Sequence, residues 1–137
     1  IKINSPFSLL DSGCSNCNQL RRLIFMLGTF HSIWTFDVTD LVAWKLEAKQ
    51  AMIVLQKRPG FVSASIFHNA DSPERYLIKT DWNDVGSYRR ALGSMEAKIG
   101  VWPFLANMRD EPTAFELLLE FTSNSVIEFE SSVNHEV

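Results

Sequence analysis

The sequence predicts an α+β fold of the ferredoxin-like type, with the element order β-α-β-β-α-β. Four segments alternate apolar and polar residues with the period of two that is typical of strands. Two further segments repeat apolar residues at helical spacing. The change between the two periods is abrupt at Pro59-Gly60, where a helical pattern stops and a strand pattern begins. This order predicts an antiparallel sheet of four strands with both helices on one face.

The first strand is expected within residues 28–38, "GTFHSIWTFDV", where two sets of alternating residues face opposite sides. One set is Phe30, Ser32, Trp34 and Phe36, and the other is His31, Ile33 and Thr35. The helix that follows is expected to reach about Lys57, with Thr39 as its N-cap and Asp40 in its first turn. Its core-facing stripe is Trp44, Ala48, Ala51 and Leu55, widened by Val42, Leu46 and Ile53.

The second half of the unit follows the turn at Pro59-Gly60. Strands are expected at 61–68 and at 75–82, joined by a connection rich in turn-forming residues. Asn83 is the expected N-cap of the second helix, which Gly93-Ser94 ends or kinks. After a short helical segment, the alternation of "TAFELLLEF" predicts a last strand over 113–121. The face of Tyr76, Ile78, Thr80 and Trp82 on the third strand is expected to meet the helices.

Composition and charge exclude some classes of partner. The chain has 137 residues and a net charge of −3, with no clustered stripe of Lys and Arg. Because nucleic-acid binding depends on neutralising phosphates, we expect no nucleic-acid partner. The longest apolar run, residues 23–27, is too short to cross a bilayer, so we expect no membrane partner.

The two cysteines, Cys14 and Cys17, form a CxxC motif. Such a motif can be a redox pair or half of a zinc site. No convincing strand precedes it, and the three histidines lack ligand spacing, so the sequence predicts no metal site. Two cysteines do not indicate a secreted disulfide scaffold, which favours a cytoplasmic protein.

The chain divides into three parts by composition. Residues 1–27 show no sustained helical or strand-like spacing of apolar residues, and we interpret them as an N-terminal extension. Residues 28–121 form the predicted domain, and residues 122–137 form a polar, acidic tail that we expect to be loosely held. The sheet face away from the helices is mixed, with Ile33, Leu77 and Leu118 among Lys79, Glu116 and Glu120. Burying those aliphatic side chains favours a two-fold homodimer.

The stretches "PGFVSASIF", "RYLIKTDWNDVGSYRRAL" and "WPFL" resemble the antibiotic-biosynthesis monooxygenase domain, over roughly residues 28–121. The matching features are Pro59-Gly60-Phe61 at the start of the second strand, Trp82 at the end of the third, and Tyr88 in the next helix. The resemblance implies a dimeric α+β barrel. It also implies oxidation of a small aromatic or polyketide-type substrate by dioxygen, with no metal or flavin cofactor.

By this resemblance, the catalytic candidates are His68 as a base, Trp82 as a donor to a substrate oxygen, and Arg89 as an anion stabiliser. The substrate-binding candidates are Trp34, Tyr88 and Trp102. Each also has an ordinary interpretation: the aromatic residues as core, Arg89 as a solvated residue, and His68 as a partly buried histidine.

Two functions from different classes therefore stay open. The first is a cofactor-independent monooxygenase-like enzyme, and the second is a non-catalytic dimeric module that binds a small apolar molecule or has a structural role. Convergence of His68, Trp82 and Arg89 on one cavity would favour the enzyme. Haem degradation, known among relatives of the family, is disfavoured because no histidine lies between His68 and His135.

Overall fold

The computed structural model describes residues 27–132 of the chain. These residues fall into two compact units. One unit is Thr29–Phe115, and the described part of the other is residues 27–28 and 116–132. The N-terminal extension proposed from the sequence, including Cys14 and Cys17, lies outside the described residues except for Leu27.

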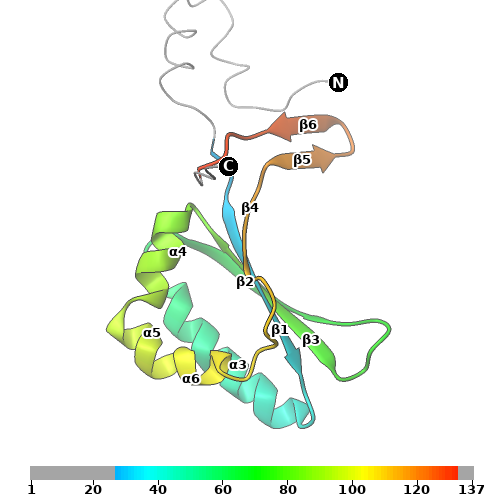
Figure 1. Cartoon of the computed structure of the whole chain (residues 1–137), viewed down its shortest axis with the longest axis vertical. Helices are drawn as coiled ribbons and strands as arrows, with labels where there is room; N and C mark the ends of the chain where they lie inside the picture. The colour runs from blue at the N-terminus through cyan, green and yellow to red at the C-terminus, as the bar shows by residue number, and fades with distance from the viewer. Residues whose placement is uncertain (1–26, 133–137) are drawn as a thin grey trace, which may run out of the picture. The chain divides into compact units, whose positions relative to one another are not determined.

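The larger unit has the predicted architecture. Its four-stranded sheet has the order β2-β3-β1-β4, and β3 pairs antiparallel with both β1 and β2. The helices lie on one face of this sheet (Figure 1). In chain order, the elements are β1 (Phe30–Asp37), α3 (Leu41–Gln56), β2 (Phe61–His68), β3 (Arg75–Trp82), α4 (Val85–Leu92), α5 (Met95–Gly100), α6 (Trp102–Leu105) and β4 (Ala114–Glu116).

The register of β1 against β3 separates the two faces of the sheet as predicted. The even-numbered residues of β1 are buried toward the helices, and the odd-numbered ones are half-buried or exposed on the other face. Because side chains alternate along a strand, the same division holds on β3. The pairs on the helix face are Phe30 with Trp82, Ser32 with Thr80, Trp34 with Ile78, and Phe36 with Tyr76.

Helix α3 buries the predicted stripe but not its predicted margins. Trp44, Ala48, Ala51 and Leu55 are buried, together with Met52. The expectation that Val42, Leu46 and Ile53 widen the stripe is wrong: these side chains are 82%, 58% and 48% exposed. The N-cap is Asp40, whose side chain accepts from the Ala43 N–H, and not Thr39. Both residue types cap well, and the helix begins one residue later than the sequence suggested.

The second predicted helix begins at an Asp cap rather than at Asn83. The Asp84 side chain accepts from the Ser87 N–H, and hydrogen bonds from the backbone and side chain of Ser87 hold the pKa of Asp84 below its usual value. The Asn83 N–H instead donates a hydrogen bond to the Gly60 carbonyl oxygen, at 2.8 Å. As predicted, α4 ends at Gly93, and Ser94 caps the next helix.

The single last strand expected over residues 113–121 is wrong. Strand β4 ends at Glu116, and a separate strand, β5 (Leu119–Thr122), pairs with β6 (Ser125–Glu128) in a two-stranded sheet. The expectation of a loosely held tail from Thr122 is also wrong for residues 125–128, because they form β6 and Ser125 is buried. Leu118 lies between β4 and β5 and is not part of the four-stranded sheet.

The turn at Pro59-Gly60 depends on glycine. Gly60 has a φ of +87°, the left-handed region that other L-residues rarely adopt. It also lies against α4, since a Cβ at this position would stand 2.2 Å from the Ser87 Oγ. The turn therefore brings the start of β2 next to the start of α4.

We predict that Gly60→Ala lowers the free energy of unfolding by about 1–3 kcal/mol, the usual cost of a non-glycine residue in this backbone region. Urea unfolding followed by Trp fluorescence measures the change. The matched control is Gly86→Ala in α4, where the added Cβ meets the flexible end of Arg90 at 3.0 Å and the Asp84 Oδ1 at 3.4 Å, an ordinary contact distance. The control should raise stability by up to about 1 kcal/mol, because alanine favours helix. Equal effects of the two variants would contradict the assigned turn.

Candidate functional site

Three of the predicted site residues, Trp34, Trp82 and Tyr88, come together between the sheet and the helices. The rings of Trp82 and Tyr88 lie 6.0 Å apart, and Trp82 also meets Phe61 edge to face at 5.3 Å. Trp34 and Trp82 are almost fully buried. Burial raises the pKa of Tyr88, although hydrogen bonds from Trp34 and Thr113 oppose the shift. The three side chains belong to the hydrophobic core between the sheet and the helices.

The indole N–H of Trp82 already has a partner within the protein. It donates to the Thr80 Oγ1 at 2.8 Å, and the Thr80 hydroxyl also contacts the hydroxyl of Ser32. All three side chains are fully buried. A buried donor without a partner would cost roughly 1–3 kcal/mol, so this polar chain stabilises the layer that it crosses.

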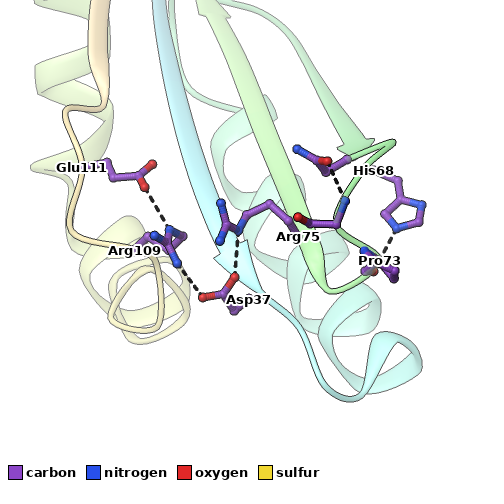
Figure 2. Close-up of polar contacts among 8 residues, drawn as sticks. Asp37, His68, Pro73, Arg75, Arg109 and Glu111 are labelled. Carbon is purple, nitrogen blue, oxygen red and sulfur yellow. Dashed lines mark hydrogen bonds and ion pairs between the residues drawn. The ribbon is translucent and has the colours of Figure 1, made fainter.

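The other predicted site residues lie elsewhere. His68 stacks on Tyr76 with ring centroids 4.4 Å apart, and its Nε2 lies 2.9 Å from the Pro73 carbonyl oxygen (Figure 2). Since His68 pairs with Tyr76 and Phe61 with Trp82, His68 and Trp82 are six residues apart along β3, or roughly 20 Å. The structure does not bring these two side chains together.

Arg89 and Trp102 also lie apart from the buried aromatic residues. Arg89 is an exposed residue of α4. Trp102 is half exposed, and its indole N–H donates to the Leu92 carbonyl at 2.8 Å. The catalytic and binding roles assigned to the six candidates stay predictions, and only three of those residues share one place in the fold.

An open groove of about 470 Å³ lies between α3 and β2. Most of its lining is apolar, and a few polar side chains are placed among the apolar ones, which is the usual make-up of a small-molecule site. The apolar lining residues are Met52, Ile53, Phe61, Ala64 and Ile66, and the polar ones are Lys49, Gln56, Ser63 and Ser65. Phe61 connects the groove to the aromatic layer, by which we mean the buried rings of Trp34, Trp82 and Tyr88 and their neighbours, because its ring contacts Trp82.

Asp81, on the sheet face away from the helices, is the centre of a polar cluster that the sequence reasoning missed. Its carboxylate accepts from the Ser63 hydroxyl at 2.6 Å and lies 2.5 Å from the His31 Nδ1 and 3.0 Å from the Lys79 Nζ. Burial opposes ionisation of Asp81, but the hydrogen bonds from Ser63, Lys79 and His31 outweigh it and hold the pKa below its usual value. The available signal was the alternation that places His31 and Asp81 on the same face.

A second cluster of charges joins three parts of the larger unit around Asp37. The Asp37 carboxylate accepts from the Arg75 Nε and the Arg109 Nη1, each at 2.8 Å, and Arg109 also pairs with Glu111 (Figure 2). The hydrogen bonds from Arg75 and Arg109 hold the pKa of Asp37 below its usual value. These ion pairs are exposed, and their arrangement ties the end of β1 to the segment that leads into β4.

Residues 27–132 offer neither a metal-binding cluster nor a membrane-spanning helix. They contain no group of three or more His, Cys, Asp or Glu side chains that could hold a metal ion. In the same range, no helix has the length and apolar character that crossing a bilayer requires.

Comparison with solved structures identifies the fold. SnoaB from Streptomyces nogalater, named a cofactor-independent oxygenase, matches in a variant form with a TM-score of 0.60 and 17% identity, over 72% of this chain and 99% of SnoaB. This chain has the fold of solved structures that are named as antibiotic biosynthesis monooxygenases. A Nitrosomonas europaea protein provisionally named as such a monooxygenase matches with a TM-score of 0.55 and 12% identity, over 74% and 98% of the two chains.

The likeness is one of fold. A conserved protein from Methanosarcina mazei, whose name gives no activity, also matches, with a TM-score of 0.53 and 18% identity over 63% of this chain and 86% of its own. No protein-family model and no curated protein matches this chain. The resemblance proposed from the sequence is thus confirmed for the fold, and the reaction needs evidence of its own.

We predict that Trp82→Phe lowers the free energy of unfolding by about 1 kcal/mol more than Trp44→Phe does. Both substitutions shrink a buried ring, but the Trp82 N–H bonds to Thr80, whereas the buried Trp44 Nε1 has no hydrogen-bond partner among residues 27–132. Chemical unfolding of the two variants measures the difference. A greater loss for Trp44→Phe would contradict the role assigned to the Trp82 hydrogen bond.

Proposed function

We propose that this protein binds a small, largely apolar aromatic molecule in the groove between α3 and β2. The observation that carries the proposal is the groove itself, which has the volume and the lining of a small-molecule site and lies on a fold shared with a named oxygenase. Phe61 offers a ring for aromatic contact, and Met52 adapts to irregular ligand shapes.

The polar lining residues suit a ligand that carries a phenolic hydroxyl. Gln56 lines the groove and offers an amide donor and an amide acceptor to such a hydroxyl, whereas the Ser63 hydroxyl is hydrogen-bonded to Asp81 on the other face of the sheet. Lys49 is a groove-lining cation and would stabilise a phenolate that forms when the ligand loses its proton. These two side chains would orient the ligand and favour its ionised form.

In its catalytic form, the proposal is oxidation of this ligand by dioxygen without a metal or flavin. The electron-rich substrate anion supplies the electrons, one oxygen atom enters the product, and the other leaves as water. The support for this step is the fold shared with SnoaB, a protein named as a cofactor-independent oxygenase. A non-catalytic binding module is the second candidate, and it is favoured by the separation of His68 from Trp82 along β3.

The first experiment tests binding and oxidation separately. Anthrones and substituted hydroquinones are screened by thermal shift under anaerobic conditions, and oxygen uptake is followed after aeration with no added flavin or metal. We expect stabilisation by at least one of these compounds, followed by enzyme-dependent oxygen uptake. Binding without uptake would select the non-catalytic module, and no binding would overturn both candidates.

Two variants on α3 test whether the ligand binds in the groove. We predict that Ile53→Glu raises the Kd of the bound compound at least about 10-fold, because it removes an aliphatic contact worth roughly 1.5–3 kcal/mol and adds a charge to the groove. Val42→Glu on the same helix is the matched control, since Val42 is exposed and is not among the groove-lining residues. The same Kd for both variants would place the ligand elsewhere.

We also propose a two-fold homodimer formed over the sheet face away from the helices. Ile33 and Leu77 lie half-buried on that face in the single chain, and a second copy would cover them. Light scattering at micromolar concentration should give the mass of two chains. A mass of one chain would contradict the dimer without affecting the groove proposal.

A further inference from the structure

Thr29, His31 and Asp81 are joined by two hydrogen bonds in series. The Thr29 Oγ1 lies 2.8 Å from the His31 Nε2, and the His31 Nδ1 lies 2.5 Å from the Asp81 Oδ1. Thr29 and His31 are two residues apart and so point to the same side of the chain at β1. Asp81 is the direct partner of His31 across the sheet, in β3.

The order of donors and acceptors in this chain is determined by Asp81. An ionised carboxylate can only accept hydrogen bonds, so the proton between it and the imidazole belongs to the His31 Nδ1. In the neutral imidazole, Nε2 then carries a lone pair and accepts the hydroxyl proton of Thr29. This is the arrangement in which a histidine removes a proton from an attacking hydroxyl group.

The surroundings hold Asp81 and His31 in place. The second carboxylate oxygen of Asp81 accepts from Ser63 on β2, and Lys79 on β3 adds a positive charge 3.0 Å from the first. The side chains of His31 and Asp81 are each only 18% exposed. Partial exclusion of water strengthens these contacts, because a lower local dielectric strengthens electrostatic interactions.

We propose that Thr29 is a nucleophile that accepts an acyl group from an activated ester, with His31 as its general base and Asp81 as a positioning residue. The Thr29 oxygen bonds to the carbonyl carbon, and the bond from that carbon to the leaving group breaks. The proton of Thr29 passes to the His31 Nε2 and then to the departing alkoxide, phenoxide or thiolate. Water, deprotonated by the same histidine, later releases the acid and restores Thr29.

This site is distinct from the proposed groove. Thr29 and His31 are not among the residues that line the groove, and the step needs neither oxygen nor an aromatic substrate. The site shares the face away from the helices with the proposed homodimer contact: Ile33 lies two residues from His31 on β1, and Leu77 lies nearer the other end, opposite Thr35. Failure of the ligand screen would therefore leave this inference intact, and the reverse also holds.

The expected rate is modest. Oxyanion donors usually contribute about 10²–10³ in rate, and the proposal includes none. The general base contributes about 10²–10⁴ by itself. We therefore expect one acyl or phosphonyl group to be transferred to each chain at a measurable rate, with slow release.

The test is covalent labelling of the full chain with an alkyl fluorophosphonate. In this reaction the Thr29 oxygen bonds to phosphorus, fluoride leaves, and His31 takes the proton. Peptide mass spectrometry should place one adduct per chain on Thr29, and p-nitrophenyl acetate should give a matching burst of p-nitrophenolate. Label spread over other residues, or none on Thr29 of the folded chain, would overturn the proposal.

Variants separate chemistry from folding. Thr29→Val and His31→Gln should each lower the labelling rate about 100-fold or more, whereas Thr29→Ser should keep it. Thr35→Val is the matched control, because Thr35 lies on the same face of β1 and should leave labelling unchanged. Thermal unfolding checks that each variant is folded, and equal labelling of folded His31→Gln and the unaltered chain would overturn the role of His31.

The tautomer of His31 distinguishes a positioning role of Asp81 from a merely structural one. Imidazole ¹⁵N shifts should show the proton on Nδ1 of His31 in the unaltered chain. In Asp81→Asn they should show a shift of the proton toward Nε2, together with slower labelling. An unchanged tautomer with slower labelling would contradict positioning by Asp81.

Discussion

The pairing register of β1 against β3 is the constraint on which the rest of the larger unit depends. Side chains alternate along a strand, so a slip of one residue would move every side chain of β1 to the opposite face. In the observed register, Phe30 and Trp34 lie on the sheet face that the helices cover. His31 lies on the other face, where it contacts Asp81. The aromatic layer and the polar cluster are thus two results of a single alignment.

The two faces have different chemistry because of this division. On the helix face, the indole of Trp82 and the hydroxyls of Ser32 and Thr80 use their hydrogen bonds on one another, within a layer that aromatic rings fill. Little polar capacity is left there for a substrate. Polar groups that a small molecule can reach lie instead in the groove beside α3 and around His31. The two sites proposed for this chain therefore lie outside the buried aromatic core.

The sequence predicts the sheet well because its patterns are local. Alternation in β1 and β3 assigned the correct faces, and Pro59-Gly60 marked a turn that requires glycine. Helix starts were wrong by one residue at Thr39 and Asn83, since adjacent residues could cap equally well and the backbone decides. The break after Glu116 left no sign, because apolar alternation continues through Leu117 and Leu119 into a different sheet.

The candidate site was harder to predict because it depends on which strands are neighbours. His68 was favoured as a base from its position at the end of a strand, but it stacks on Tyr76 and lies far from Trp82. His31, which has a carboxylate partner, gains that partner only through the contact between residues 50 positions apart. Periodicity shows the face of a residue, and the strand order and register show its partner.

The most direct test of this account is the β1–β3 register in solution, measured by nuclear Overhauser contacts between backbone protons of the two strands. The account predicts contacts that pair Ser32 with Thr80 and His31 with Asp81. Contacts displaced by one residue, pairing Ser32 with Asp81 or with Lys79, would contradict it. Such a result would remove the buried hydrogen-bond chain and the Thr29–His31–Asp81 site together.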